Sequence, residues 1–221
     1  MMDFIRKIYK KYSQQIRNIK FFKIRKKIKG KKVSIISSDC LGGILYHDMG
    51  LEFDSPTINL FFKESDYSFL NFCLDIDYYL NKEIVVKDDI NFPKGIIRGD
   101  DRHQDVNIGF MHYQTAIDAK ESWDKRKKRI QKNRIIFYLK FELDKQDLFY
   151  INKIDNIFVI TSQKTNPELI NDKVHTSKYF SKLDKNDGKI MSFKGLFGRR
   201  NFDDLALMRY IDEQCDKGYE I

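Results

Sequence analysis

The sequence contains few of the residues that interrupt or cross-link a folded chain. Among 221 residues there are only 11 glycines and 3 prolines, and 42% of the residues are hydrophobic, which is enough for a substantial core. No run of about 18 apolar residues occurs, so we expect no transmembrane helix. The first residues have no apolar segment, so we expect no secretory signal. Three widely spaced cysteines do not fit a disulfide framework or a zinc site, and they favour a reducing cytoplasm.

Positive charge is concentrated at the start of the chain. Residues 1–32 hold 13 of the 41 Lys and Arg residues but only one of the 32 acidic residues, so this segment carries a net charge of +12. The rest of the chain carries a net charge of −3. Because a nucleic-acid-binding fold usually spreads its basic residues over one face, we expect no specific nucleic-acid partner.

Residues 1–29 are predicted to form a basic amphipathic helix. Apolar residues recur at spacings of three and four, and Lys and Arg fill the remaining positions. Such a helix can bind an anionic membrane surface with its apolar stripe at the headgroup boundary. The alternatives are a helix that packs on the domain, a partly disordered arm, and a segment that binds nucleic acid. The apolar positions are Ile5, Ile8, Tyr12, Ile16 and Ile19.

From residue 31 onwards, short apolar strands alternate with amphipathic helices. This alternation predicts an α/β fold of three layers, with a mixed, mostly parallel sheet flanked by helices and preceded by the basic helix. We therefore divide the chain into an arm, residues 1–30, and a single α/β domain, residues 31–221. Strands are expected at 33–37, 57–62, 83–87, 96–97, 106–113, 135–141, 157–161 and 189–193, helices at 41–49, 66–81, 116–132, 145–154 and 203–216, and loops over most of 162–189.

Cys40 is the most suggestive residue for chemistry. It follows a predicted strand and precedes a short helix, and a helix N-terminus stabilises a thiolate and so lowers the pKa of a thiol. Gly42 and Gly43 let backbone N–H groups approach an oxyanion or a phosphate. His112, near the end of another apolar strand, is a candidate base, in the chain order of papain-like enzymes. The alternative is that Cys40 is a small buried residue in a tight corner.

Two further groups are candidates for substrate binding. His47 and Asp48 are adjacent on the short helix and point about 100° apart, so they do not form a dyad with each other, although either could face the Cys40 corner. Trp123, Arg126 and Arg129 share one helical face, where the Arg pair could hold a phosphate or carboxylate and the indole could stack on a sugar or base. A solvated charged face explains this second group equally well.

Two blocks of the sequence resemble a bacterial family of domains of unknown function that is commonly labelled exopolysaccharide or capsular polysaccharide biosynthesis protein. The first block is IISSDCLGGILYHDMGLEFDSPTINLFF, residues 35–62, and the second is HYQTAIDAKESWDKRKKRI, residues 112–130. The resemblance extends over about residues 31–193 and leaves the basic arm outside. Asp39 stands where the family's corner has Asn. The resemblance implies a cytoplasmic enzyme or accessory factor in surface-glycan assembly, without defining a reaction.

Together these observations favour a transferase or accessory enzyme of surface polysaccharide biosynthesis at the cytoplasmic face of the membrane. Asp39, Cys40 and His112 would carry the chemistry, with His112 as general base, and Arg126 and Arg129 would hold a sugar nucleotide or lipid-linked glycan. One alternative is a hydrolase or acyltransferase with Cys40 as nucleophile. Another is a non-catalytic, membrane-peripheral scaffold. No pattern in the sequence predicts a metal site or a cofactor.

Overall fold

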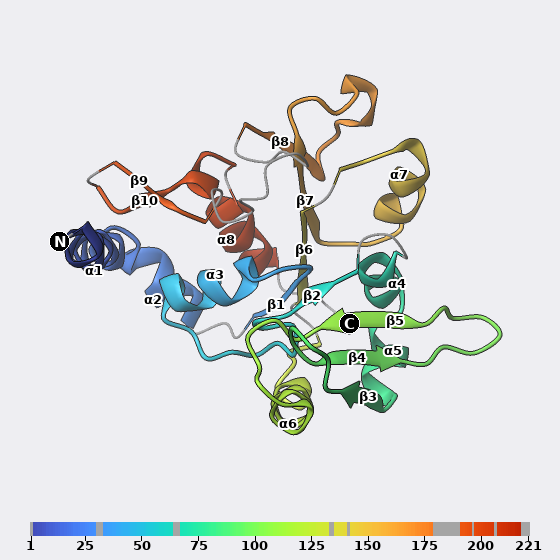
Figure 1. Cartoon of the computed structure of the whole chain (residues 1–221). Helices are drawn as coiled ribbons and strands as arrows, with labels where there is room; N and C mark the ends of the chain where they lie inside the picture. Colours follow the sequence, from blue (N-terminus) through green and yellow to red (C-terminus); the bar gives the residue numbers. More distant parts are fainter. Residues whose placement is uncertain are drawn as a thin grey trace.

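A four-stranded parallel sheet at the centre of the molecule confirms the predicted α/β class. In the computed structural model the strands lie in the order β1-β6-β7-β8, and each neighbouring pair is parallel (Figure 1). Every residue of β7 is buried, as expected for a strand covered on both faces. The strands are β1 (Ser34–Ser37), β6 (Ile135–Lys140), β7 (Ile157–Ser162) and β8 (Val174–Ser177). The structure describes residues 2–29, 33–63, 67–132, 135–140, 142–178, 191–195, 197–205 and 207–217.

Helices cover both faces of the parallel sheet. Successive side chains of a strand point to opposite faces, so Ile35 packs in one hydrophobic cluster and Ile36 in the other. One face lies against α3 (Leu41–Met49) and α8 (Leu207–Lys217), and the other faces α4 (Ser68–Leu74) and α7 (Lys145–Asn152) (Figure 1). The resulting three layers are those that the sequence predicts.

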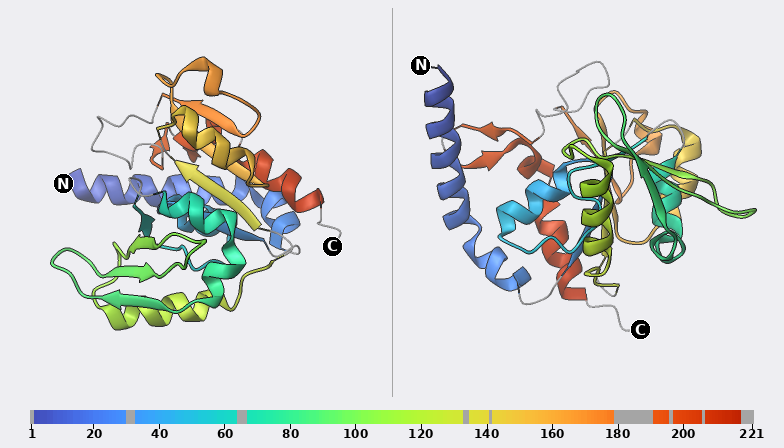
Figure 2. Two further views of the ribbon diagram at one scale, coloured as in Figure 1. Left: turned by 90° about the vertical axis from the view of Figure 1, so that its right-hand side faces the viewer. Right: turned by 60° about the horizontal axis from the view of Figure 1, so that its bottom comes forward.

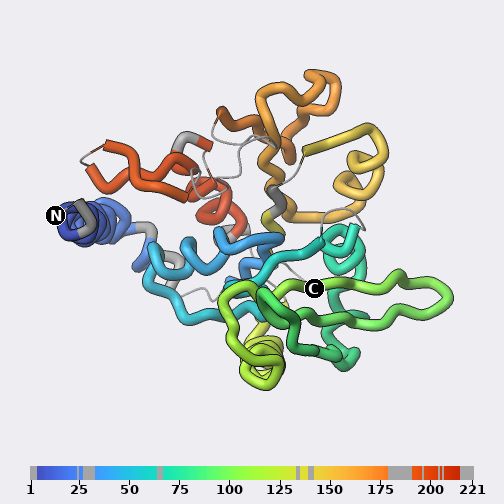
Figure 3. Tube along the Cα trace, viewed as in Figure 1, coloured from blue at the N-terminus to red at the C-terminus, as the bar shows by residue number. Residues whose placement is uncertain are grey.

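The strands between residues 61 and 109 form a second, antiparallel sheet of their own. Its order is β2-β5-β4-β3, and the trace in Figure 3 shows this segment as a lobe beside the parallel sheet. Short connections explain the separation, because a parallel neighbour needs a crossover of a dozen or more residues. The helix α6 (Ala116–Lys127) packs on this lobe. The strands are β2 (Phe61–Phe62), β3 (Ile84–Lys87), β4 (Lys94–Ile97) and β5 (Val106–Gly109).

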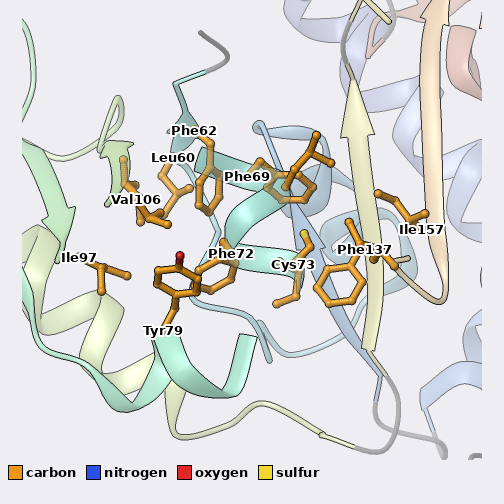
Figure 4. Packing of buried hydrophobic residues seen from close by; sticks show 14 of the residues in the cluster. Leu60, Phe62, Phe69, Phe72, Cys73, Tyr79, Ile97, Val106, Phe137 and Ile157 are labelled. Atoms are coloured by element: carbon orange, nitrogen blue, oxygen red, sulfur yellow. The ribbon is translucent and has the colours of Figure 1, made fainter. Parts of the chain in front are cut away.

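A single aromatic-rich cluster joins the two sheets. Phe137 of β6 and Phe72 of α4 lie in it together with Leu60 and Phe62 (Figure 4). The ring of Phe72 also packs edge-on against Trp123 of α6, with 6.1 Å between ring centroids. Because aromatic side chains bury large apolar areas, this cluster fixes the lobe against the parallel sheet.

Several boundaries differ from the sequence-based expectation. The helix predicted over 66–81 is two helices, α4 and α5 (Ile76–Asn81), because Asp75 leaves the helical region and caps α5 by accepting from the amide of Tyr78. The region predicted to be loop, 162–189, contains β8 and the short 3-10 helix η2 (Pro167–Leu169). The strand predicted at 189–193 falls partly outside the described residues.

The basic N-terminal segment is helical and packs on the α/β domain. It forms α1 (Met2–Lys20) and α2 (Phe22–Lys29), with α1 lying along one side of the molecule (Figure 2). The hairpin of β9 (Phe193–Lys194) and β10 (Arg199–Arg200) lies between α1 and the rest of the fold, and the 3-10 helix η4 (Asn201–Leu205) follows it. Within the described ranges, none of the helices has the length and apolarity needed to cross a bilayer.

Candidate functional site

The candidate site lies where the two sheets meet. The parallel strand β1 ends at Ser37, and the carbonyl of Ser38 accepts a hydrogen bond of 3.1 Å from the amide of Phe62 in β2. The chain then turns through Cys40 into α3. On the other side, β5 ends at Gly109, and a turn closed by the Tyr113 amide and the Phe110 carbonyl follows at once. Both segments therefore project from strand ends at one junction.

This junction brings Cys40 and His112 together. The Sγ of Cys40 lies 3.4 Å from Nε2 of His112, which is hydrogen-bond distance for sulfur, although 72 residues separate them in the chain. His112 is exposed and Cys40 is partly exposed, so reagents in solvent can reach the pair. Cys40 is also the N-cap residue of α3, so the positive end of the helix dipole favours its thiolate form.

Asp39 holds the corner in shape. Its Oδ1 accepts hydrogen bonds from the amide of Leu41 at 2.8 Å and from the hydroxyl of Ser37 at 3.3 Å. The side chain of Cys40, the N-cap residue, makes no capping hydrogen bond. The Asp39 carboxylate takes this role by accepting from an amide in the first turn of the helix. Asp39 is therefore a positioning residue for Cys40.

The two glycines have different roles. An added Cβ on Gly42 would lie 2.7 Å from the Cβ of Ser37, so Gly42 is required for the close approach of α3 to β1. The amide of Gly42 donates to the Ser37 hydroxyl at 3.2 Å. The amide of Gly43 donates to no acceptor within the described ranges, and a Cβ there would meet only ordinary contacts, the nearest 3.4 Å away at Asn59. Gly43 thus presents a first-turn N–H that an anion could take.

Arg126 supports the turn that carries His112. Its Nη1 donates to the hydroxyl of Tyr113 at 2.5 Å and to the carbonyl of Ile58 at 3.3 Å. The Tyr113 hydroxyl also donates to the Ile58 carbonyl at 3.3 Å. The guanidinium further lies over the ring of Phe53. These contacts tie α6, the His112 turn and the loop before β2 into one unit.

The three residues expected to share one helical face are not all on one helix, because the helix predicted over 116–132 ends at Lys127 and Arg129 lies beyond it. Trp123 is only 1% exposed and packs against Phe72 and Phe110, so its indole is part of the core and is not available to stack on a sugar. Arg129 forms an ion pair with Glu52, and Arg126 has the partners described above. Helical spacing predicts that the three side chains share one face. Trp123 is instead buried in the core, because its indole is a large apolar group.

His47 and Asp48 face different surroundings, and no hydrogen bond joins them. His47 is exposed, and its Nδ1 lies 3.7 Å from the Asp48 carboxylate, beyond hydrogen-bond distance. Asp48 is 1% exposed and binds two guanidinium groups, with Arg17 Nε at 2.5 Å and Arg200 Nε at 2.7 Å. Asp48 therefore anchors α1 and β10 on α3 and does not face the Cys40 corner as a ligand-binding group.

Two other histidines are placed in environments that the sequence did not indicate. His103 stacks on Tyr78 and lies within hydrogen-bond distance of Asp100 (2.8 Å) and Asp75 (3.1 Å), and these contacts raise the pKa of the imidazole. His175 of β8 stacks on Phe158 of β7, and burial lowers the pKa of this second imidazole. Across the described part of the chain, no group of His, Cys, Asp and Glu is arranged to hold a metal ion.

Comparison with known proteins identifies the family to which this chain belongs. Residues 10–212 match the model of a family described as "Domain of unknown function (DUF1919)". An "Uncharacterized protein" of Haemophilus influenzae is 25% identical over 196 residues, which cover 86% of this chain and 88% of that relative. The match begins inside α1 and so includes most of the basic helix, which the resemblance seen in the sequence left out.

Proposed function

Since the chain belongs to the DUF1919 family, whose description states no activity, we propose from the geometry of its site that it is a cysteine-dependent hydrolase or acyltransferase. The observation that carries this proposal is the contact between Cys40 Sγ and His112 Nε2 at 3.4 Å. A thiol at a helix N-terminus beside an imidazole is the arrangement in which cysteine becomes a nucleophile.

The proposed reaction has two steps. In the first, His112 Nε2 takes the thiol proton, Cys40 Sγ attacks the carbonyl carbon of an ester, amide or thioester, and the leaving group departs with the proton from His112. The product is a thioester on Cys40. In the second, His112 takes a proton from water or an acceptor hydroxyl, that oxygen attacks the thioester, and Cys40 leaves as a thiol that regains the proton.

The surroundings of Cys40 support such a reaction. The N–H of Gly43 in the first turn of α3 is a donor for the negative charge that develops on the carbonyl oxygen. Asp39 fixes the corner from which Cys40 projects, through its hydrogen bond to Leu41. The Arg126–Tyr113 contact fixes the turn of His112. Both members of the pair are thus held by neighbours that do not take part in the chemistry.

We further propose that the enzyme acts in surface polysaccharide assembly. The support for this pathway is the family resemblance of residues 35–62 and 112–130, and none of the contacts described above adds to it. The donor-binding role expected for Arg126 and Arg129 loses support, because both guanidinium groups have intramolecular partners. An enzyme that transfers an acyl group through Cys40 to a hydroxyl of a glycan would fit both the acyltransferase proposal and a place in polysaccharide assembly. A cytoplasmic location would keep Cys40 reduced.

The test measures the reactivity of the Cys40 thiol. The full-length protein is treated with iodoacetamide over a range of pH, and the alkylated Cys40 peptide is quantified by mass spectrometry. We expect half-maximal reactivity well below the ordinary thiol pKa of about 8.5, and an upward shift of that profile in His112→Ala. Incubation with activated acyl esters should also add one acyl group to Cys40.

Cys73 provides an internal control for the same experiment. It is buried, and burial raises the pKa of its thiol well above the ordinary value, so it should stay unmodified in the folded protein. An identical Cys40 profile in the wild type and in His112→Ala would contradict the proposal. An acyl group that is retained after Cys40→Ala would also contradict the proposal, because the adduct would then lie on another residue.

A further inference from the structure

The helix α1 is attached to the domain through its polar face. Arg17 is fully buried, and its guanidinium binds Asp48 of α3 at 2.5 Å and Asp203 of η4 at 2.7 Å. Ser13, one turn earlier on the same face, is also fully buried. Tyr9 of this helix donates to the carbonyl of Gly195 in the β9–β10 hairpin. These contacts set the rotation of α1 about its own axis.

The same rotation leaves the apolar stripe of α1 facing away from the domain. At about 100° per residue, the centre of the stripe lies about 140° around the helix from Ser13 and Arg17. Figure 2 shows the domain on one side of α1 only. The stripe is 49–78% exposed at Phe4, Ile5, Ile8, Tyr12 and Ile19, and it continues at Phe22 of α2, which is 63% exposed.

Turning the helix to bury this stripe would take the Arg17 guanidinium away from two carboxylates. Asp48 would then be left buried with one of its two cations removed, which is strongly unfavourable. The exposed stripe is therefore a consequence of the ion pairs that seat the helix. A continuous row of exposed apolar side chains such as this one indicates a surface that a membrane or another molecule covers.

Exposed basic residues beside the stripe indicate what covers it. At about 100° per residue, Lys7 and Lys11 lie on one side of the stripe and Lys20 lies on the other, and residues 1–32 contain one acidic residue. We propose that α1 and the start of α2 form a docking surface for an anionic lipid bilayer, in which the stripe enters the headgroup boundary and the cations contact lipid phosphates. This is the charge and apolar pattern of an interfacial helix. The inference does not depend on the reactivity of Cys40.

The docking surface predicts a definite orientation. Asp48 of α3 binds Arg17 of α1, and Cys40 is the N-cap residue of α3, so contacts within the domain connect the lipid-binding helix to the Cys40 corner. The stripe faces outward from the opposite side of α1. The bound protein therefore faces the membrane with the side of α1 that is opposite to its contacts with α3 and η4.

Vesicle sedimentation tests the proposal with the full chain. We expect the wild-type protein to sediment with phosphatidylglycerol vesicles, to stay in solution with phosphatidylcholine vesicles, and to be released by high salt. The double variant Ile8→Gln, Ile19→Gln removes two exposed apolar side chains of the stripe and should weaken binding by about tenfold or more.

A matched control uses exposed isoleucines elsewhere on the molecule. Ile90 is 99% exposed and Ile117 is 71% exposed, so Ile90→Gln, Ile117→Gln makes the same chemical change away from α1 and should bind like the wild type. Equal sedimentation of the stripe variant and this control would overturn the proposal. Self-association that the stripe variant abolishes in the absence of vesicles would also overturn it, since a second copy of the chain would then cover the stripe.

Discussion

Arg126 and Tyr113 are joined by a hydrogen bond of 2.5 Å from a guanidinium Nη1 to a phenol oxygen. Tyr113 is the residue after His112, so this bond connects α6 to the turn that places the imidazole beside Cys40. Arg126 reaches no reacting atom. It acts through the backbone of the His112 turn, and it also holds the loop before β2 by donating to the carbonyl of Ile58.

We predict that Arg126→Ala slows alkylation of Cys40 and destabilises the fold by about 1–3 kcal/mol, because it leaves a partly buried hydroxyl and carbonyl with fewer donors. The pH profile of Cys40 alkylation should move toward that of His112→Ala. Lys125→Ala is the control, since this neighbour is exposed. A loss of stability with an unchanged Cys40 profile would show that Arg126 has no positioning role.

The two glycines at the start of α3 should respond in opposite directions to the same substitution. Gly42→Ala brings a Cβ to 2.7 Å from Ser37 Cβ and should destabilise the fold by about 1–3 kcal/mol. Gly43→Ala meets nothing closer than 3.4 Å and should be neutral or stabilising by up to about 1 kcal/mol, since alanine is the better helix former. Urea unfolding of the two variants measures both effects. Equal destabilisation would mean that the close approach to β1 is not what selects glycine.

Removal of the buried carboxylate of Asp48 should be among the most damaging single changes. Asp48→Ala leaves buried Arg17 with one of its two carboxylates and removes the carboxylate that Arg200 binds, and we expect a loss of about 3–5 kcal/mol. Urea unfolding gives the value. The control is Arg98→Ala, which breaks an exposed pair with Asp105 and should change stability by less than about 1 kcal/mol. Similar losses in both variants would contradict a structural role for Asp48.

The cluster of His103, Asp100 and Asp75 should make part of the stability depend on pH. The hydrogen bond to Asp100 and then the one to Asp75 raise the pKa of His103 above its unfolded value of about 6.5. The stabilisation is therefore complete below about pH 6.5 and is lost as the pH rises through the raised folded-state pKa. The stability difference between the wild type and His103→Asn should be larger at about pH 6 than at about pH 9. A difference that is constant over this range, or an unshifted NMR titration of the His103 ring, would contradict the prediction.

Much of the α/β architecture could be predicted from local pattern. The run Ile157–Thr161 reads as a buried strand because all its residues are apolar or β-branched, and it is a strand of the parallel sheet. Strand β8 is not predicted because its buried residues, Val174 and Ser177, are three positions apart and so produce no alternating signal. The division of the strands into two sheets was missed because pairing partners are not encoded by the periodicity of a single strand.

The sequence indicates Cys40 and His112 as candidate site residues, but it does not show which other candidates face the site and which are structural. The strand end and the glycines indicate Cys40, and a place near the end of the strand predicted at 106–113 indicates His112. That strand ends at Gly109, and His112 lies in the turn that follows it. Trp123 and Asp48 have the side chains of ligand-binding residues, but one is core and the other is an ion-pair anchor. Burial decides between those roles, and burial depends on neighbours that are distant in sequence.

The sequence by itself determined most of the helices and strands and a basic amphipathic segment, because these follow from local spacing of apolar and charged residues. Only the tertiary structure decided that α1 docks through Arg17 with its apolar stripe outward, and that Cys40 and His112 come within 3.4 Å. Both relationships join residues that are 31 and 72 positions apart. Contacts across such separations are set by how the sheets and helices pack together, which local propensity does not specify.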